Sequence, residues 1–231
     1  FPVDSEHCAI WQCLQGEKRK DIARLILTAS GGPFLRLSPD QMSKITPEEA
    51  LKHPTWRMGE KVTIDSATLM NKGMESIEAR WLFNLPPQNI YVLIHPGSIV
   101  HSMVEFIDGS VKAQLGIPDM RLPIQYALSY PERLPNPRLP SIKWEQFHSL
   151  SFESPDFSKF PCLALAIQAI ERGGTFPAVL SAADEVAVEL FLSHRIGFLD
   201  IARILEDILD HHQSVSSPSL EEILVADNWS R

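Results

Sequence analysis

Residues 61–83 read KVTIDSATLMNKGMESIEARWLF, and this stretch decides how the middle of the chain folds. Ser66 is a favourable helix N-cap. After it, apolar residues recur at helical spacing, at Leu69, Met70, Met74, Ile77 and Trp81. This pattern predicts an amphipathic helix that starts near Ser66 and buries its apolar stripe. Gly73 inside the helix costs roughly 1 kcal/mol relative to alanine, which indicates that another group approaches the backbone closely there.

Polar residues of the same helix form a second stripe. Asn71, Glu75 and Glu78 share one face, and Lys72 neighbours Glu75 across one turn. A helix start that presents Ser66, Asn71 and Lys72 suits a phosphate group, because free backbone N–H groups and the helix dipole favour an anion. Glu75 suits a hard cation. The alternative is an ordinary amphipathic helix with solvated charges.

Composition bounds the class of protein. The chain has 231 residues, of which 44% are hydrophobic and 22% charged, so it can form one large domain or two small ones. The net charge of -8, without any Lys/Arg-rich run, argues against nucleic acid as a partner. No apolar stretch approaches the roughly 18 to 20 residues that span a bilayer. We expect a protein of the cytoplasm, or of the plastid stroma if the source is a plant or alga, with no membrane partner.

The cysteines and the first residue lead to two further expectations, one about the redox compartment and one about the extent of the protein. Cys8, Cys13 and Cys162 form neither an even disulfide framework nor a CxxC pair, which predicts buried thiols in a reducing compartment. The chain begins at Phe1 rather than at a methionine. We therefore expect it to be part of a larger enzyme.

Two acidic residues lie close to the first expected helix. Residues 1–3 are interpreted as the end of a strand, and Ser5 is expected to cap a helix that continues to about Leu14. Asp4 and Glu6 then lie where a strand gives way to a helix, a position suited to ligands of Mg²⁺ or Mn²⁺. The alternative is a capping serine whose acidic neighbours favour the helix dipole.

A second strand is expected at residues 21–29, followed by the glycine pair Gly31 and Gly32. Such a pair after a strand lets backbone N–H groups approach a ligand, although a plain turn is the alternative. The chain contains neither GxGxxG nor GxxxxGK[ST]. Residues 35–60 lose periodicity and predict a lid with Trp56 and Met58 on its underside; a short helix that packs Trp56 is the alternative.

The next segment predicts a hairpin. A strand at residues 91–94 is followed by residues 102–107 and 110–115, which alternate in polarity on either side of an Asp-Gly pair. His101 precedes this hairpin, where it could meet a phosphate or an oxyanion of a substrate. A buried structural histidine is the alternative. A short helix is expected at residues 122–130.

The fold class expected from these elements is α/β. A catalytic domain with a mixed sheet is expected at residues 1–138 and a linker at residues 139–161. A small C-terminal helical bundle is expected at residues 162–231. Its helices are expected at 163–172, 178–194, 199–212 and from 220 onward.

Taken in order, the motifs closely resemble the 1-deoxy-D-xylulose 5-phosphate reductoisomerase family. The motifs are PVDSEH (2–7), SGGPF (30–34), HPTWRMG (53–59), DSATLMNKGME (65–75), HPGSIVHSMV (95–104), DGS (108–110) and PDMR (118–121). The match is dense to about residue 120. After residue 161 it is carried mainly by helical pattern.

The resemblance implies an NADPH-dependent enzyme that makes 2-C-methyl-D-erythritol 4-phosphate from a phosphorylated sugar. It also implies Mg²⁺, Mn²⁺ or Co²⁺ as cofactor, a homodimer, and inhibition by fosmidomycin. The family carries its NADPH-binding domain ahead of the residue equivalent to Asp4, so we expect this chain alone to bind metal and substrate analogue without reducing anything. Two alternatives stay open: a metal-dependent phosphosugar isomerase or aldolase without nicotinamide, and a non-catalytic helical scaffold.

The resemblance also implies roles for individual residues. It implies metal ligands at Asp4, Glu6 and Glu75, and further catalytic residues at His53 and His101. It implies phosphate contacts at Ser30, Ser66, Asn71 and Lys72, and contacts with the substrate's carbon skeleton at Ser5, Ser98 and His101. It implies a mobile lid at His53, Trp56 and Met58, with Trp56 also touching substrate, and nicotinamide contacts at Gly31 and Met120.

Overall fold

The computed structural model describes residues 1–52, 58–146 and 148–231. Its Cα positions group the chain into two compact units. The sheet unit holds residues 1–30 and 79–155, and the helical unit holds residues 31–78 and 156–231. The expected division into residues 1–138, 139–161 and 162–231 stays a prediction about domains.

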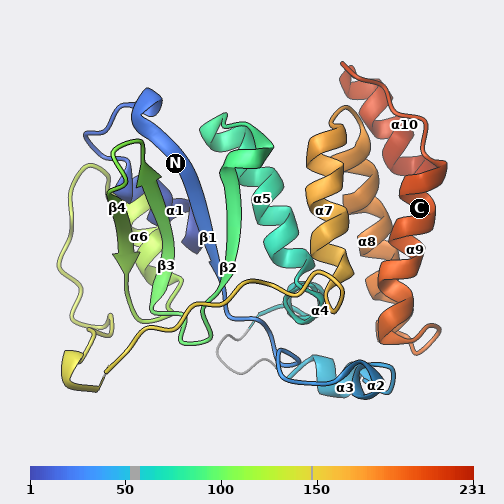
Figure 1. The fold of residues 1–231 in the computed structure, drawn as a ribbon, viewed down its shortest axis with the longest axis horizontal. Coiled ribbons are helices and arrows are strands. Elements are labelled where there is room, and N and C mark those ends of the chain that lie inside the picture. The colour runs from blue at the N-terminus through green and yellow to red at the C-terminus, as the bar shows by residue number, and fades with distance from the viewer. Residues whose placement is uncertain (53–57, 147) are drawn as a thin grey trace. The chain divides into compact units, whose positions relative to one another are not determined.

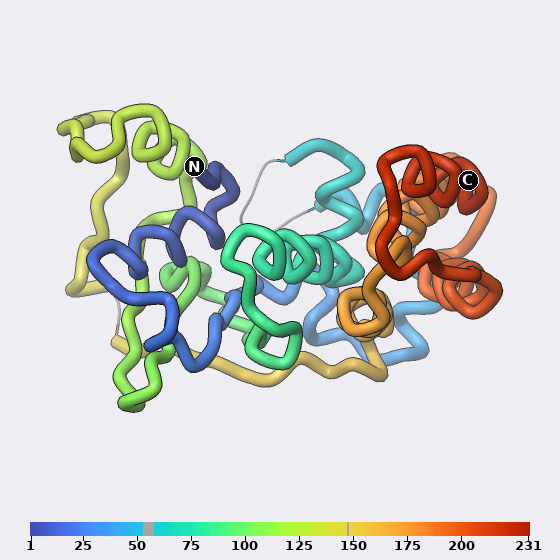
Figure 2. The backbone as a smooth tube through the Cα atoms, turned by 90° about the horizontal axis from the view of Figure 1, so that it is seen from above, coloured from blue at the N-terminus to red at the C-terminus, as the bar shows by residue number. Residues whose placement is uncertain are grey.

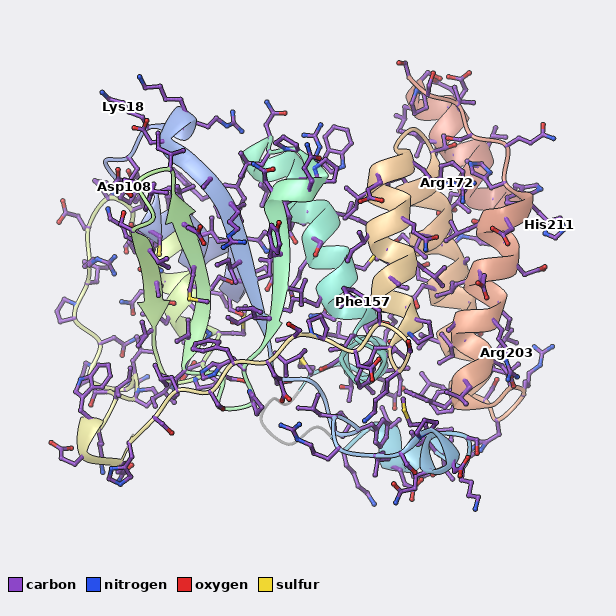
Figure 3. The ribbon with its side chains drawn as sticks, viewed as in Figure 1. Lys18, Asp108, Phe157, Arg172, Arg203 and His211 are labelled. Carbon is purple, nitrogen blue, oxygen red and sulfur yellow. The ribbon has the colours of Figure 1, made fainter. Side chains whose placement is uncertain are left out.

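A mixed four-stranded sheet forms the centre of the sheet unit, in the order β2-β1-β3-β4 (Figure 1). β1 (Ile22–Ala29) runs parallel to β2 (Ile90–Ile94) and antiparallel to β3 (Val100–Phe106). β3 pairs antiparallel with β4 (Val111–Leu115), so the expected hairpin and the expected α/β class are confirmed. Figure 3 marks Asp108 at the turn between the two hairpin strands.

β1 lies centrally because its residues, IARLILTA, are apolar almost throughout and suit burial on both faces. Helix α1 (Ser5–Cys13) packs against β3 and β4, and α6 (Arg121–Ser129) packs against α1. Single turns of 3₁₀ helix occur at Arg19–Asp21, Pro87–Asn89 and Trp144–Gln146. One core cluster of this unit contains Ile10, Cys13, Ile22, Leu25, Leu27, Ala79, Phe83, Leu85, Val104 and Phe106.

Four C-terminal helices dominate the helical unit: α7 (Pro161–Arg172), α8 (Phe176–Leu192), α9 (Phe198–His211) and α10 (Leu220–Ser230). Figure 2 shows them nearly end-on. α8 contacts each of the other three, which explains why its sequence is apolar on most sides. α9 is amphipathic, and Figure 3 shows Arg203 and His211 pointing away from the bundle.

Three shorter helices of this unit are α2 (Pro39–Met42), α3 (Pro47–Ala50) and α4 (Glu60–Thr68). Ser38 and Thr46 cap α2 and α3 with capping boxes, each followed by a proline at the first helical position. The short helices α2 and α3 lie within the segment that lacked periodicity. Their local caps, rather than an apolar stripe, define them.

The stretch at residues 61–83 folds as two helices rather than one, so the expectation that Ser66 starts the helix is wrong. Gly59 is the N-cap of α4, and Ser66 lies inside that helix. Leu69 adopts a left-handed conformation with φ of 61°, which ends α4. α5 (Met70–Phe83) then begins, and the Met70 N–H donates to Thr68 Oγ1 at 3.3 Å.

Two further expectations are corrected. Trp81 is 72% exposed, so the apolar stripe of α5 is not buried along its whole length. Residues 1–3 form no strand, and Asp4 rather than Ser5 is the N-cap of α1. Asp4 and Glu6 therefore lie at a helix start that follows irregular backbone. The three cysteines are free and buried, as expected.

Among the helices that the structure describes, none combines the length and apolar character that a membrane crossing requires.

The close approach expected at Gly73 is present. A Cβ atom added at Gly73 would collide with the Cβ of Ala166 on α7, so this glycine lets α5 and α7 pack together. We expect Gly73→Ala to lower the free energy of unfolding by roughly 1–3 kcal/mol, the usual cost of overpacking. Denaturant unfolding measures this change.

The control for this prediction is Gly59→Ala, because a Cβ there meets no atom of the described residues within 4 Å. We expect that variant to lose at most about 1 kcal/mol, because the only cost is that alanine is a poorer N-cap residue than glycine. Adding Ala166→Gly to Gly73→Ala should restore much of the lost stability. Failure of that rescue would show that the collision is not the cause.

Candidate active site

The first turn of α1 gathers three of the predicted site residues in the sheet unit. Asp4 is the N-cap residue, and Ser5 and Glu6 follow it in the helix. The Ser5 hydroxyl donates to Glu6 Oε2 at 2.5 Å, and all three residues are half-buried. Carboxylates here lie at the positive end of the helix dipole, which favours their ionised form. Ionised oxygens are the donors that Mg²⁺ and Mn²⁺ prefer.

A small cavity in the same unit connects α1 with the hairpin. Ser5 and His101, to which the resemblance gives contacts with the same carbon skeleton, both line it. The other lining residues are Cys8, Gln12, Gln114, Asp119, Leu122 and Pro123. His101 lies on β3 and is buried. The cavity wall therefore combines an imidazole, a hydroxyl and two amides, a set that suits a polar ligand.

Two neighbours shape the surroundings of His101. A Cβ at Gly116 would lie 3.4 Å from His101 Nε2, so the glycine leaves room beside the imidazole. Burial raises the pKa of the Cys8 thiol, and Cys8 is consequently neutral at physiological pH. The cavity thus offers no thiolate nucleophile from Cys8. Cys8, Gln12 and Gln114 had been given no role from the sequence, where single side chains on separate elements show no common spacing.

Ser98 lies in the turn after β2 and is held by His95. Ser98 is buried and has a positive φ of 49°, unusual for a residue with a side chain. The buried His95 ring accepts from the Ile99 N–H through Nε2 at 3.2 Å, so its Nδ1 donates to the Ser151 carbonyl at 2.8 Å. His95 thereby fastens the turn that contains Ser98 to the segment around residue 151.

Ser30 ends the sheet unit's first segment just after β1, whereas Gly31 and Gly32 belong to the helical unit. A Cβ at Gly32 would lie 2.6 Å from the Ser66 carbonyl oxygen, so this loop packs directly against the backbone of α4. Only glycine permits that approach, and the contact fixes the position of the Ser66 backbone. Met120, the N-cap residue of α6, is 37% exposed.

The start of α5 brings three predicted residues together in the helical unit. Lys72 Nζ donates to Glu75 Oε2 at 2.5 Å, and Asn71 Nδ2 donates to Glu75 Oε1 at 2.6 Å. The Lys72 and Glu75 side chains are only 5% and 4% exposed. A buried carboxylate bonded at both oxygens is fixed in place and ionised, because the adjacent ammonium compensates its charge.

The other predicted residues have simpler outcomes. Met58 is half-buried just before α4. His53 and Trp56 lie outside the described residues. Asp4 and Glu6 belong to the sheet unit and Glu75 to the helical unit, so a cluster of these three carboxylates stays a prediction.

The buried Lys72–Glu75 pair predicts that the two residues contribute to the free energy of unfolding in a coupled way. We expect Lys72→Met to lower the free energy of unfolding by about 3 kcal/mol, because it leaves a buried carboxylate without its counter-charge. The double change Lys72→Met with Glu75→Gln should recover most of that loss. Denaturant unfolding of the four chains in metal-free buffer gives the coupling energy, and strict additivity would contradict a buried ion pair.

Comparison with known proteins places these features in a family. Residues 1–83 match the model for the 1-deoxy-D-xylulose 5-phosphate reductoisomerase C-terminal domain, and residues 115–231 match that for the DXP reductoisomerase C-terminal domain. The reductoisomerase of Pelotomaculum thermopropionicum is 57% identical over 231 residues, and that of Heliobacterium modesticaldum is 59% identical over 233 residues. All of this chain is covered, and 59% of each relative.

Solved structures agree with the sequence relatives. The reductoisomerase from Zymomonas mobilis in complex with NADPH is 48% identical with a TM-score of 0.92, over 100% of this chain and 59% of that one. A DOX-P reductoisomerase in complex with NADPH, fosmidomycin and magnesium is 45% identical with a TM-score of 0.93, over 100% of this chain and 61% of that one. The chain thus spans about three fifths of the length of these relatives. Over that span, the chain belongs to the 1-deoxy-D-xylulose 5-phosphate reductoisomerase family.

Proposed function

We propose that this chain forms the metal- and substrate-binding part of a 1-deoxy-D-xylulose 5-phosphate reductoisomerase. The reaction converts that phosphosugar and NADPH into 2-C-methyl-D-erythritol 4-phosphate. The observation that carries the proposal is the buried Asn71, Lys72 and Glu75 arrangement at the start of α5. It supplies a fixed cation for a phosphate beside a fixed carboxylate for a metal ion. Related solved structures contain NADPH, fosmidomycin and magnesium.

The donor set suits a hard divalent cation. Asp4, Glu6 and Glu75 offer only carboxylate oxygens, the ligands of Mg²⁺ and Mn²⁺. Glu75 is already ordered by Asn71 and Lys72, so little conformational freedom is lost when it binds an ion. A cation held there would act as a Lewis acid toward the oxygens of the substrate.

The protein's own residues bind and orient the substrate. An ammonium group has three N–H donors, so Lys72 is able to donate to a phosphate oxygen while it also donates to Glu75. Ser66 and Ser30 would add hydroxyl donors to the same phosphate. Ser5 and His101, which share a cavity wall, and Ser98 would contact the carbon skeleton. Holding both ends of the substrate keeps its fragments close while bonds are rearranged.

The cofactor and assembly belong to the same proposal. Gly31 and Met120 would contact the nicotinamide of NADPH, a role that the exposure of Met120 permits. His53, Trp56 and Met58 would cover the bound substrate. We also infer a homodimer, as the family resemblance implies, and a location in the cytoplasm, or in the plastid stroma if the source is a plant or alga.

The proposal is tested by calorimetric titration of the chain with Mn²⁺, and then with fosmidomycin in the presence and absence of the metal. We expect fosmidomycin to bind only when Mn²⁺ is present. Glu75→Gln should weaken Mn²⁺ binding by about tenfold or more, because a charged ligand is replaced by a neutral one. Lys72→Ala should weaken fosmidomycin binding far more than Mn²⁺ binding.

The matched control is Glu60→Gln, which neutralises an exposed carboxylate at the start of α4. It should leave both affinities within about twofold. Equal losses of metal and fosmidomycin in Lys72→Ala would refute the phosphate role of that lysine. Absence of metal binding in the parent chain would count against the function as a whole.

A further inference from the structure

Three charged groups meet between two helices of the helical unit, and none has been given a role so far. Lys61 lies in the first turn of α4, Asp65 one turn later, and Asp184 in the middle of α8. Lys61 Nζ donates to Asp65 Oδ2 at 2.6 Å and also donates to Asp184 Oδ2. Asp65 is 4% exposed and Asp184 is 0% exposed. One ammonium group therefore ties α4 to α8 through two buried carboxyl groups.

The charges of this triad do not balance unless a proton is added. Two ionised carboxylates facing one ammonium leave a net negative charge, which is costly at a buried site. The Oδ1 atoms of Asp65 and Asp184 are buried and have no hydrogen-bond partner among the described residues. A proton on one carboxyl group makes the triad neutral, and it converts one of these unused oxygens into a potential donor.

Among the residues that the structure describes, the neighbouring titratable groups supply no second positive charge. Cys162 on α7 faces both carboxyl groups, and burial together with their charge raises the pKa of its thiol, which stays neutral. Glu185, next to Asp184 on α8, adds repulsion and is itself bonded to Arg231 of the chain end beyond α10. On the side of α3, Glu48 is exposed and paired with His194. The proton is thus what compensates the second carboxylate.

The titration behaviour agrees with this geometry. Burial, with added repulsion from Asp184, raises the pKa of Asp65 to about 8, although Lys61 opposes the shift. Burial also raises the pKa of Asp184, against the attraction of Lys61. The pair therefore keeps one proton at neutral pH and loses it in alkaline solution.

The position of α4 matters because Ser66 directly follows Asp65 and because Gly32 packs on the Ser66 carbonyl. We propose that Lys61, Asp65 and Asp184 are positioning residues that share one proton and fix α4, and with it Ser66, for the anionic group of a ligand. This role rests on the proposed function and adds to it a dependence on pH. Loss of the proton would place an unpaired negative charge between α4 and α8 and loosen that contact.

The sign of the stability change follows from the raised pKa. An unfolded aspartate loses its proton near pH 3.9, whereas the folded pair keeps one proton up to about pH 8. The unfolded state therefore binds fewer protons between these values, and stability falls as the pH rises through this window. Above it, the contribution is constant.

The variant Asp184→Asn tests the shared proton, because it keeps the shape of the site and leaves one carboxylate facing one ammonium. We expect the melting temperature of the parent chain to fall by several degrees more between pH 6.0 and pH 8.5 than that of Asp184→Asn. Glu189→Gln, an exposed change on the same helix, should follow the parent. Identical pH profiles for the parent and Asp184→Asn would overturn the shared proton.

Fosmidomycin titrations with Mn²⁺ at pH 7.5 and pH 9.5 test the positioning role. The parent should lose about tenfold more affinity across this range than Asp184→Asn, and comparing variants at each pH cancels the ionisation of the ligand. Equal losses in a parent chain that binds fosmidomycin would overturn positioning and leave the proposed function intact. No binding by the parent at either pH would contradict the proposed function and the positioning role with it, while the melting profiles would still decide the shared proton.

Discussion

Lys72 donates to Glu75 across the first turn of α5, and the candidate site of the helical unit depends on this buried pair. An isolated charge at such depth would be prohibitively costly, and each of the two groups compensates the charge of the other. Asn71 bonds the second oxygen of Glu75 and removes its remaining freedom. The helix thereby presents a cation and a carboxylate in fixed positions before any ligand arrives.

Packing around this pair decides where it lies. Gly73 brings the backbone of α5 against Ala166 of α7, and no side chain larger than hydrogen fits at that contact. Leu69 ends α4 in a left-handed conformation, so Ser66 and Lys72 lie on two separate helices. Gly32 adds a third constraint through its contact with the Ser66 carbonyl. These backbone contacts, and not only side chains, would hold the proposed phosphate site in place.

The helical unit contains a second group of buried charges, which differs from the first in its charge balance. The Lys72 pair is balanced by one ammonium for one carboxylate, whereas Lys61 faces two carboxyl groups and needs a proton to reach neutrality. The first arrangement therefore needs no added proton, and the second does. Both arrangements bear on the one proposed ligand, since α4 and α5 carry Ser66, Asn71 and Lys72, which are proposed to bind its phosphate.

The sequence by itself determined strands β1 to β4, with their hairpin, and the C-terminal helices, although not the strand expected at residues 1–3, because apolar period and turn residues act locally. The order of the motifs also determined the family. Local patterns predicted the close approach at Gly73 but not the group that approaches it, which tertiary packing supplied in Ala166.

Only the tertiary structure decided the break at Leu69, where a favourable N-cap at Ser66 had predicted one helix start and the chain instead continues α4 through that residue. Tertiary structure also decided the exposure of Trp81 and the partners of Lys61. The spacing of Lys61 and Asp65 suggests a local pair, but Asp184 lies more than a hundred residues away, within an apolar helix. Contacts between residues distant in sequence depend on how whole helices pack, and no local pattern of residues encodes that packing.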